Sequence, residues 1–400
     1  MIRYLHSYTL FSLSLLSSLL LFTSVNSQAN EACFADIRQQ ALGAGVSART
    51  VERVMAHAKI EPKIVALDRK QPEFSTTFAD YMGKRVNETR IEKGRALRQT
   101  HSKLLTELTR KYGVPGHYLL AFWGLETNFG GYMGKKNAPS ALATLACDGR
   151  RASFFTAELI ETMRLVEKYK LDPAKMESSW AGAMGQTQFM PSTFARYAVD
   201  GDNDGKVDLW NSTADALASG ANYLKALDWQ TRRRWGREVL LPAGFEWSVT
   251  GRKAPKKTLA QWRALGVRTA AGHKLPDVSD IEASIIAPAG HKGPAFIIYK
   301  NFNVIMGWNR SEYYALSVGH LADRIAGAGE LRRAPPTDKG LRRVEVKAIQ
   351  QSLNELGFDA GKPDGIIGSA TRRAVRAYQL LNKMIADGYP DEELYRRLKS

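Results

Sequence analysis

One glutamate in the sequence has the position that a general acid–base catalyst requires. Glu126 lies near the end of residues 115–130, PGHYLLAFWGLETNFG, a pattern that predicts a helix beginning near the proline and ending at the glycines. Phe122 and Trp123 precede it by four and three residues, so their rings share its helix face. Aromatic surface and the negative end of the helix dipole both raise the pKa of a carboxyl, as a general acid needs near neutral pH. The alternative is a glutamate that is solvated at the helix end or paired with Lys135.

A second segment is suited to holding a sugar. Residues 178–191, SSWAGAMGQTQFMP, are rich in small residues and side-chain amides. Small residues allow the backbone to approach a ligand closely, and Ser and Gln side chains can hydrogen-bond to the hydroxyl and acetamido groups of a glycan. A tight crossing of two helices, one of them ended by Pro191, explains the same composition, and the two interpretations are compatible.

Residues 200–211, DGDNDGKVDLWN, follow the pattern of a calcium-binding loop of the EF-hand type. Oxygen ligands stand at positions one, three and five, glycine at six, and a backbone carbonyl at seven. At position twelve Asn211 replaces the usual bidentate glutamate, and Asp215 could serve instead if the loop is longer. The predicted ligands of this structural ion are Asp200, Asp202, Asp204, Lys206 through its carbonyl, and Asp215. The alternative is a solvated, aspartate-rich turn.

Other catalytic classes leave no comparable pattern. The seven histidines are dispersed, without HExxH or another paired spacing for zinc. The sequence contains no glycine-rich phosphate loop and no Gly-x-Ser-x-Gly elbow. We therefore expect no cofactor for catalysis.

The elements that must position these residues are mainly helical. Apolar residues at three- and four-residue steps predict helices within 34–112, 152–170, 212–229 and 311–326. Between 236 and 307, short β-like runs separated by Gly and Pro predict a small strand-containing lobe inserted in the helical body.

A small unit follows a linker at the C-terminus. The linker, at 329–341, contains Pro335-Pro336 and several charges. Beyond it, at 342–400, two apolar helix faces and a short terminal helix predict a three-helix domain with a core too thin for a deep active site. The first face comprises Val346, Ile349, Leu353 and Leu356, the second Ala374, Val375, Tyr378 and Leu381, and the terminal helix carries Leu394 and Leu398.

The N-terminus predicts export. In residues 1–27 a positive residue precedes an apolar stretch at 10–22, and small residues follow at 25–27, as in a cleaved signal peptide. A transmembrane anchor is the alternative, but this stretch is short for a span of about 20 residues. Cys33 lies too far on to carry a lipid anchor. We therefore expect a periplasmic protein without stable membrane insertion.

The charge of the chain points to a polyanionic partner. Lys and Arg number 57 against 40 acidic residues, for a net charge of +17. Such a balance favours nucleic acid, an anionic membrane surface or an acidic wall polymer. Export, and the lack of RNP, zinc-finger or basic-zipper patterns, argue against nucleic acid. We expect a monomer that binds no nucleic acid.

The chain has two cysteines, Cys33 and Cys147. In an oxidising compartment two such residues are more often paired than free. A disulfide would close a loop of more than a hundred residues, which the loop-entropy model values at about 4–5 kcal/mol. Two buried free thiols are the alternative.

Taken in order, these motifs resemble the lytic murein transglycosylase B family. The resemblance rests on WGLETNFG at 123–130, CDGRR at 147–151, WAGAMGQTQFMPS at 180–192, the Asp-rich loop, and NRSEYYA at 309–315. It implies a lysozyme-like α+β catalytic domain at 28–328 whose single catalytic carboxyl is Glu126, with Ser179 and Gln188 holding the substrate. It further implies that Tyr81, Arg150, Arg151, Tyr223, Asn309 and Tyr314 line the cleft, and that the Asp-rich loop binds calcium.

The tail is similar to the common peptidoglycan-binding domain. The matching positions are Val346, Gln350, Leu353, Gly357, Asp364-Gly365, Gly368, Thr371, Ala374, Val375 and Gln379. Such a domain would anchor the enzyme on its insoluble substrate and raise its local concentration there. A helical module for another envelope partner is the alternative.

The activity that the resemblance implies is cleavage of the β-1,4 bond between N-acetylmuramic acid and N-acetylglucosamine in peptidoglycan glycan strands, with 1,6-anhydromuramyl products. Glu126 would protonate the glycosidic oxygen and then accept the proton of the muramic acid C6 hydroxyl. The alternatives are a hydrolytic muramidase that uses water, a noncatalytic wall-binding protein and, least favoured, a nucleic-acid binder. Cell-wall synthesis proteins are candidate partners.

Overall fold

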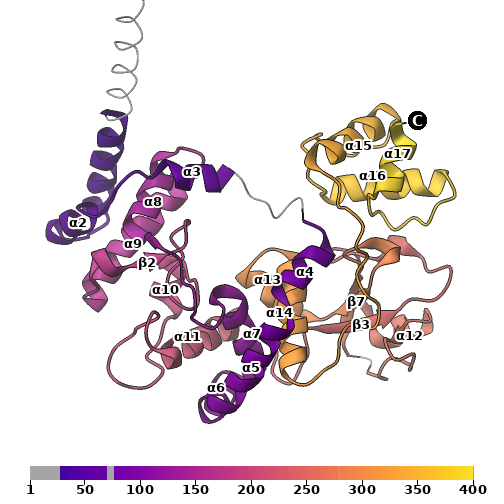
Figure 1. Ribbon diagram of the computed structural model, residues 1–400, viewed down its shortest axis with the longest axis horizontal. Helices are drawn as coiled ribbons and strands as arrows, with labels where there is room; N and C mark the ends of the chain where they lie inside the picture. Colours follow the sequence, from indigo (N-terminus) through magenta and orange to yellow (C-terminus); the bar gives the residue numbers. More distant parts are fainter. Residues whose placement is uncertain (1–27, 70–75, 279, 400) are drawn as a thin grey trace, which may run out of the picture. The chain divides into compact units, whose positions relative to one another are not determined.

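The computed structural model describes residues 28–69, 76–278 and 280–399, so the predicted signal peptide at 1–27 lies outside the described residues. The chain forms two compact units, each assembled from two segments (Figure 1). Unit 1 contains the described residues of 1–70 and 132–213. Unit 2 contains those of 71–131 and 214–400.

Unit 1 is helical, with one short ribbon. Its core pairs α8 with α9, and α2, α3 and α10 pack against these two helices. Its helices are residues 28–43, α2 (Ala48–Met55), α3 (Pro62–Arg69), α8 (Ala138–Cys147), α9 (Ala152–Tyr169) and α10 (Pro191–Tyr197), with a 3-10 turn η2 at Pro173–Lys175. Strand β1 (Lys136–Asn137) pairs antiparallel with β2 (Glu177–Ser178). The helix predicted for 152–170 is thus present as α9.

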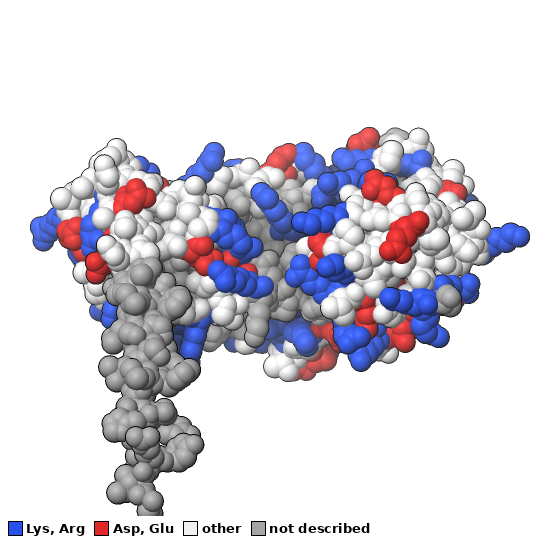
Figure 2. Space-filling view, turned by 90° about the horizontal axis from the view of Figure 1, so that it is seen from above, with Lys and Arg blue, Asp and Glu red and all other residues white. Residues whose placement is uncertain are grey.

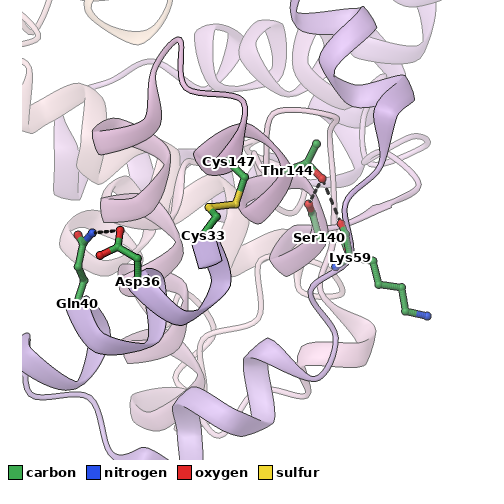
Figure 3. The surroundings of a disulfide bond; sticks show 7 residues. All are labelled: Cys33, Asp36, Gln40, Lys59, Ser140, Thr144 and Cys147. Atoms are coloured by element: carbon green, nitrogen blue, oxygen red, sulfur yellow. Dashed lines mark hydrogen bonds between the residues drawn. A yellow bond between two sulfur atoms is a disulfide. The ribbon is translucent and has the colours of Figure 1, made fainter. Parts of the chain in front are cut away.

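A disulfide joins Cys33, in the helix at 28–43, to Cys147 at the end of α8, as the sequence predicted (Figure 3). Their Cα atoms are 5.9 Å apart, and 114 positions separate them in the chain. Nearby on α8, the hydroxyl of Thr144 donates a hydrogen bond to the backbone carbonyl of Lys59 at 3.1 Å. The hydroxyl of Ser140 accepts a hydrogen bond from the backbone N–H of Lys59, also at 3.1 Å. Helix α8 therefore holds the N-terminal helices both covalently and through hydrogen bonds.

The helix-crossing interpretation of residues 178–191 is wrong. These residues form turns tied by the bridges Ser178–Met184 and Met184–Phe189. Pro191 begins α10 and does not end a helix. A proline at the first helical position loses no intrahelical hydrogen bond, because its N–H would have had no partner there.

The helical body of unit 2 is built around α7 (Gly116–Thr127) and α14 (Glu312–Ile325), which pack against each other. Helix α7 is apolar on all sides, as a helix enclosed by other helices must be. Helices α4 (Phe78–Arg85), α5 (Glu88–Thr100), α6 (Ser102–Tyr112) and α13 (Lys300–Trp308) contact this pair. Helix α11 (Thr213–Ala226) contacts α13 through the rings of Tyr223 and Trp308. The helices predicted for 212–229 and 311–326 are present as α11 and α14.

The predicted strand-containing lobe is a five-stranded antiparallel sheet in the order β4-β6-β7-β3-β5 (Figure 1). Its strands are β3 (Gly236–Leu240), β4 (Lys257–Thr258), β5 (Arg268–Thr269), β6 (Glu282–Ile286) and β7 (Ala295–Ile298). Helix α12 (Leu259–Ala264) packs Trp262 onto Ile285 and Ile297 in the lobe core. The lobe ends earlier than expected, because residues 300–308 form α13 of the helical body.

The C-terminal region has the expected three helices: α15 (Arg343–Glu355), α16 (Ser369–Leu381) and α17 (Glu392–Lys399). Their core includes Ile349, Leu353, Val375 and Leu394. Two residues assigned to the apolar faces are instead exposed, Leu356 and Leu381, because each lies at the end of its helix, past the last turn that faces the core.

Lys and Arg side chains are scattered over the face seen in Figure 2 and outnumber the acidic ones there. Across the described residues, every helix falls short of the length or the apolarity that a membrane crossing requires.

Candidate active site

Helix α7 places Glu126 in its last turn. The helix ends at Asn128, which adopts a left-handed conformation with φ 52° and donates its N–H to the carbonyl of Gly124. Phe129 then folds back so that its ring lies where a Cβ at position 124 would be, 2.8 Å from that ideal atom. The helix therefore ends two residues before the glycines at which the sequence predicted its end. Gly124 makes this end sterically possible, because a side chain at that position would collide with the ring of Phe129.

Two ring donors converge on one oxygen of Glu126. The indole Nε1 of Trp308 donates a hydrogen bond to Oε1 at 2.9 Å. The hydroxyl of Tyr314 donates to the same oxygen at 2.5 Å. Trp308 is the last residue of α13 and Tyr314 lies in the first turn of α14, so the connection between these helices delivers both donors. Neither donor is a cation. The carboxyl of Glu126 is therefore not the fully solvated group at a helix end that the alternative interpretation predicted.

Burial is the main influence on this carboxyl. It raises the pKa of Glu126 from 4.5 to about 7, against the hydrogen bonds from Tyr314 and Trp308 and the charge of Arg85, which lower it. Burial and the neighbouring Glu126 charge raise the pKa of Tyr314 well above its ordinary value, so this phenol stays neutral and remains a donor. At neutral pH the Glu126 carboxyl is thus present in both protonation states, the condition for giving and taking a proton.

The aromatic surroundings of Glu126 come from more distant parts of the chain than expected. Phe122 contributes through other rings, since its centroid lies 4.5 Å from that of Trp308 and 6.3 Å from that of Tyr314. Trp123, predicted to share the helix face of the carboxyl, makes ring contacts with His101 and Phe129.

Sequence reasoning missed two residues that act on the carboxyl, Trp308 and Arg85. Trp308 directly precedes the NRSEYYA motif, so its place beside Asn309 was a usable signal. Arg85 ends α4, where its guanidinium lies 5.0 Å from the ring centroid of Tyr81. No local pattern marks it.

The other predicted site residues of unit 2 act on the two ring donors or on the turn that carries them. Tyr223, on α11, places its ring 5.3 Å from that of Trp308. Tyr81 is buried on α4 and contributes to raising the pKa of Tyr314. The side chain of Asn309 accepts the N–H of Ser311 at 3.1 Å and so shapes the turn between α13 and α14.

In unit 1, Ser179 and Gln188 both stabilise the turns of their own loop. The hydroxyl oxygen of Ser179 accepts from the N–H groups of Ala181 and Ala183 at 3.3 and 3.2 Å. Gln188, with φ 51°, donates its amide to the carbonyls of Met133 and Gly185 at 3.0 and 3.1 Å. The loop is therefore preorganised, and the Oε1 of Gln188 keeps its acceptor capacity for a ligand.

Arg150 and Arg151 share a single acidic partner. Both guanidinium groups bind the carboxylate of Asp68 on α3, which is buried. Arg151 also stacks over the ring of Phe155, 4.7 Å from its centroid. The side chains remain 49% and 40% exposed, so their outer N–H groups are accessible to a solute.

The Asp-rich loop has the geometry of a cation site. One carboxylate oxygen from each of Asp200, Asp202 and Asp204 lies within 4.8 Å of the others. Oxygens around one Ca²⁺, each at about 2.3–2.6 Å, can lie up to about 5 Å apart, so this spread fits a single ion. Gly205 has φ 85°, as the sharp turn at position six requires.

The remaining positions of this loop fit less directly. The side-chain nitrogen of Asn211, at position twelve, donates a hydrogen bond to the carboxylate of Asp208 at 2.8 Å. Asp215 is buried in the first turn of α11 and lies outside the three-carboxylate group. The three aspartates and the carbonyl of Lys206 are the donors that the loop itself offers.

Comparison with known proteins places these features in a family. Residues 29–323 match the transglycosylase SLT domain, and residues 342–398 match a peptidoglycan binding domain. The chain is 28% identical over 298 residues to the membrane-bound lytic murein transglycosylase B of Escherichia coli, spanning 70% of this chain and 79% of that protein.

Solved structures agree with this match. The chain resembles SltB3 from Pseudomonas aeruginosa in complex with NAG-anhNAM-pentapeptide, with 42% identity, a TM-score of 0.89, and coverage of 93% of this chain and 99% of that one. It also resembles Escherichia coli Slt35 in complex with calcium, with 28% identity, a TM-score of 0.64, and coverage of 74% and 92%. Because the match to the SLT domain covers most of this chain, the protein belongs to the lytic murein transglycosylase B family.

Proposed function

We propose that this protein is a lytic transglycosylase that cleaves the β-1,4 bond between N-acetylmuramic acid and N-acetylglucosamine in peptidoglycan and leaves 1,6-anhydromuramyl ends. The observation that carries this proposal is the carboxyl of Glu126, whose pKa is about 7 and which accepts hydrogen bonds from Trp308 and Tyr314. A single carboxyl of this kind can serve first as acid and then as base.

In the proposed reaction Glu126 donates its proton to the glycosidic oxygen as the bond to the muramic acid C1 breaks. The carboxylate that results is stabilised by the two ring donors, which are already in place. It then removes the proton of the C6 hydroxyl as that oxygen attacks C1, and the ring closes. Ser179 and Gln188 would hold the acetamido group, and the exposed edges of Arg150 and Arg151 would bind sugar or peptide oxygens. No cofactor takes part.

The test of this reaction is the chemistry of the product. Purified protein acting on sacculi should release muropeptides whose mass, measured by mass spectrometry, is about 18 Da below that of the products of hydrolysis. This difference is the mass of one water molecule. A hydrolytic muramidase would yield reducing ends that borohydride reduces, and a wall-binding protein would sediment with sacculi without releasing soluble products. Either of these outcomes contradicts the proposal.

Replacing Tyr314 with phenylalanine should move the pH profile. The hydrogen bond from Tyr314 lowers the pKa of Glu126, so its loss raises that pKa further. Because the acid must be protonated, activity falls as pH rises through about 7 in the parent, and the variant should keep its activity to higher pH. Its kcat/KM at the optimum should drop about tenfold, because a hydrogen bond to a charged group is lost.

The profile of kcat/KM against pH on soluble muropeptide chains measures this effect. Tyr197→Phe, a change of the same kind in unit 1, is the matched control and should leave the alkaline limb in place. An alkaline limb that stays put, or moves to lower pH, in the Tyr314→Phe variant would show that Tyr314 does not tune the acid.

We further propose that the Asp-rich loop binds structural calcium through Asp200, Asp202, Asp204 and the carbonyl of Lys206, with Asp215 as a further ligand. The close grouping of the three carboxylates supports this, as does the calcium in the structure of the Escherichia coli relative. The ion would neutralise the carboxylates and hold the loop, and it would supply no catalytic chemistry.

Calcium should therefore raise the melting temperature of the protein. At an ion concentration about a hundred times the Kd, binding to the folded state alone contributes about 2.7 kcal/mol. Differential scanning calorimetry after chelation, with Ca²⁺ added back, measures this shift. The double variant Asp202→Asn/Asp204→Asn should show no calcium response, whereas Asp277→Asn/Asp359→Asn, outside the loop, should respond as the parent does. Equal responses in both would contradict a site in this loop.

We infer that the protein acts in the periplasm after removal of residues 1–27, and that residues 342–400 bind the wall polymer. The match of residues 342–398 to a peptidoglycan binding domain supports this anchoring role. Attachment to an insoluble polymer would raise the effective concentration of glycan near the catalytic residues.

A further inference from the structure

A ligand-sized cavity lies in the sheet lobe of unit 2. It encloses about 500 Å³, within the range of small-molecule sites. Its walls come from the residues before and at the start of β3, from β6 and the chain before it, and from the end of β7. None of its described lining residues is a partner of Glu126. The proposed reaction leaves this cavity without a role.

The cavity is strongly cationic. The cations that line it are Arg232, Arg233, Arg234, Arg237, Lys256 and Lys300, against the two carboxylates of Asp280 and Glu282. Some of the cations have acidic partners at the rim, as in the pair of Arg233 with Asp280 at 3.2 Å. In the part of the chain that the structure describes, no carboxylate lies within 4.0 Å of Arg232 or Arg237. The cavity therefore carries uncompensated positive charge.

Two donors in this cavity are buried without an acceptor among the described residues, the O–H of Tyr299 and the Nε–H of Arg237. Tyr299 is only 8% exposed, and burial raises the pKa of its hydroxyl, although the charge of Arg237 and a hydrogen bond from its guanidinium to the phenol oxygen act against this. The phenol is therefore a neutral donor beside a guanidinium. Burying such donors without acceptors costs their full desolvation, so the pair is suited to an oxygen acceptor supplied by a ligand.

The rest of the cavity wall limits the kinds of ligand that the cavity can bind. Leu259, Val278, Ile281 and Ile298 give the cavity an apolar side. A phosphate group alone would make no contact with this apolar side. A short peptide with free carboxylates offers oxygens to the arginines, small apolar side chains to the wall, and amino groups to the acidic rim.

We propose that this cavity is a second binding site, for a short acidic peptide, and that a carboxylate of the peptide is held by Arg232, Arg237 and the hydroxyl of Tyr299. The inference rests on the proposed function for the source of that peptide, the stem peptides of the wall polymer. A site of this kind would make the enzyme respond to peptide-bearing strands through a surface distinct from its catalytic residues.

The test is direct binding of a synthetic pentapeptide with an acetylated N-terminus, acetyl-L-Ala-γ-D-Glu-L-Lys-D-Ala-D-Ala, to the full chain by isothermal titration calorimetry at low salt. This peptide carries two carboxylates against one ammonium group. The double variant Arg232→Gln/Arg237→Gln should weaken binding about tenfold or more, because charge-assisted hydrogen bonds are lost. Tyr299→Phe removes one hydroxyl and leaves the ring in place, so the fold should persist. This variant should weaken peptide binding about threefold. Circular dichroism reports whether each variant is folded.

The matched control is Arg98→Gln/Arg110→Gln, which removes the same charge from exposed positions on α5 and α6 and should bind the peptide as the parent does. Peptide amidated at every carboxyl should bind much more weakly than the acid. Three results would overturn the proposal: no binding by the parent, equal binding by parent and Tyr299→Phe, or an arginine-dependent site for inorganic phosphate that ignores the peptide. Cleavage of peptide-free glycan strands by the parent tests the proposed function separately, since no peptide is involved.

Discussion

Replacing Glu126 with glutamine should abolish glycan cleavage, with kcat falling about a thousandfold or more on sacculi. Glutamine keeps an oxygen that can accept from Trp308 and Tyr314, so the local packing should persist. It can neither protonate the glycosidic oxygen nor take up the hydroxyl proton, and general acid–base catalysis typically contributes a factor of about 10²–10⁴ at each such step. The loss should appear in kcat, while binding to sacculi, measured by co-sedimentation, should match that of the parent.

Glu107→Gln is the matched control for this experiment. Glu107 is exposed on α6 and makes the same isosteric change possible without touching the proposed acid. Its activity and melting temperature should equal those of the parent. If Glu126→Gln released anhydromuropeptides at a rate within tenfold of the parent, Glu126 could not be the acid, and the proposed mechanism would be wrong.

The second large effect concerns stability. Replacing Cys33 and Cys147 together with serine should lower the free energy of unfolding by about 4–5 kcal/mol in the loop-entropy model. The disulfide spans 114 positions, and without it the unfolded chain gains the freedom that this closed loop had removed. Urea unfolding followed by circular dichroism measures the change, which should appear as an earlier midpoint.

Reduction supplies the control for the cysteine experiment. Dithiothreitol should bring the parent to the midpoint of the double-serine variant and should leave the variant itself unchanged. A parent that keeps its midpoint after full reduction, verified by thiol titration, would mean that the noncovalent contacts of the helix at 28–43 suffice to hold it.

The clearest results of sequence reasoning concern local patterns. Apolar periodicity located α9, α11 and α14, because each has to bury one or more faces. The proline and the glycines at the ends of residues 115–130 located α7. The β-like runs identified β3, β6 and β7 for the same reason. The spacing of the aspartates at 200–204 anticipated their grouping, since ligands this close in the chain need only one turn to meet.

Two local expectations were wrong for physical reasons. Residues 179–190 form turns although their small residues are also typical of helix crossings, because composition does not distinguish the two. Residues 300–308 were assigned to the strand lobe, yet they form α13, whose apolar residues pack on α14. Short apolar runs fit a buried strand or a buried helix equally well, and tertiary packing decides between them.

Sequence patterns predicted that Glu126 lies in the last turn of a helix, beside aromatic residues that raise its pKa, with a solvated or Lys135-paired glutamate as the alternative. Only the tertiary structure decided which groups act on that carboxyl, because Trp308 and Tyr314 are far from it in the chain and meet it where α13 turns into α14. Trp123, on the same helix as Glu126, packs its ring against Phe129. Helical spacing specifies which side of its own helix a residue occupies, whereas hydrogen bonds between distant segments depend on how the helices pack.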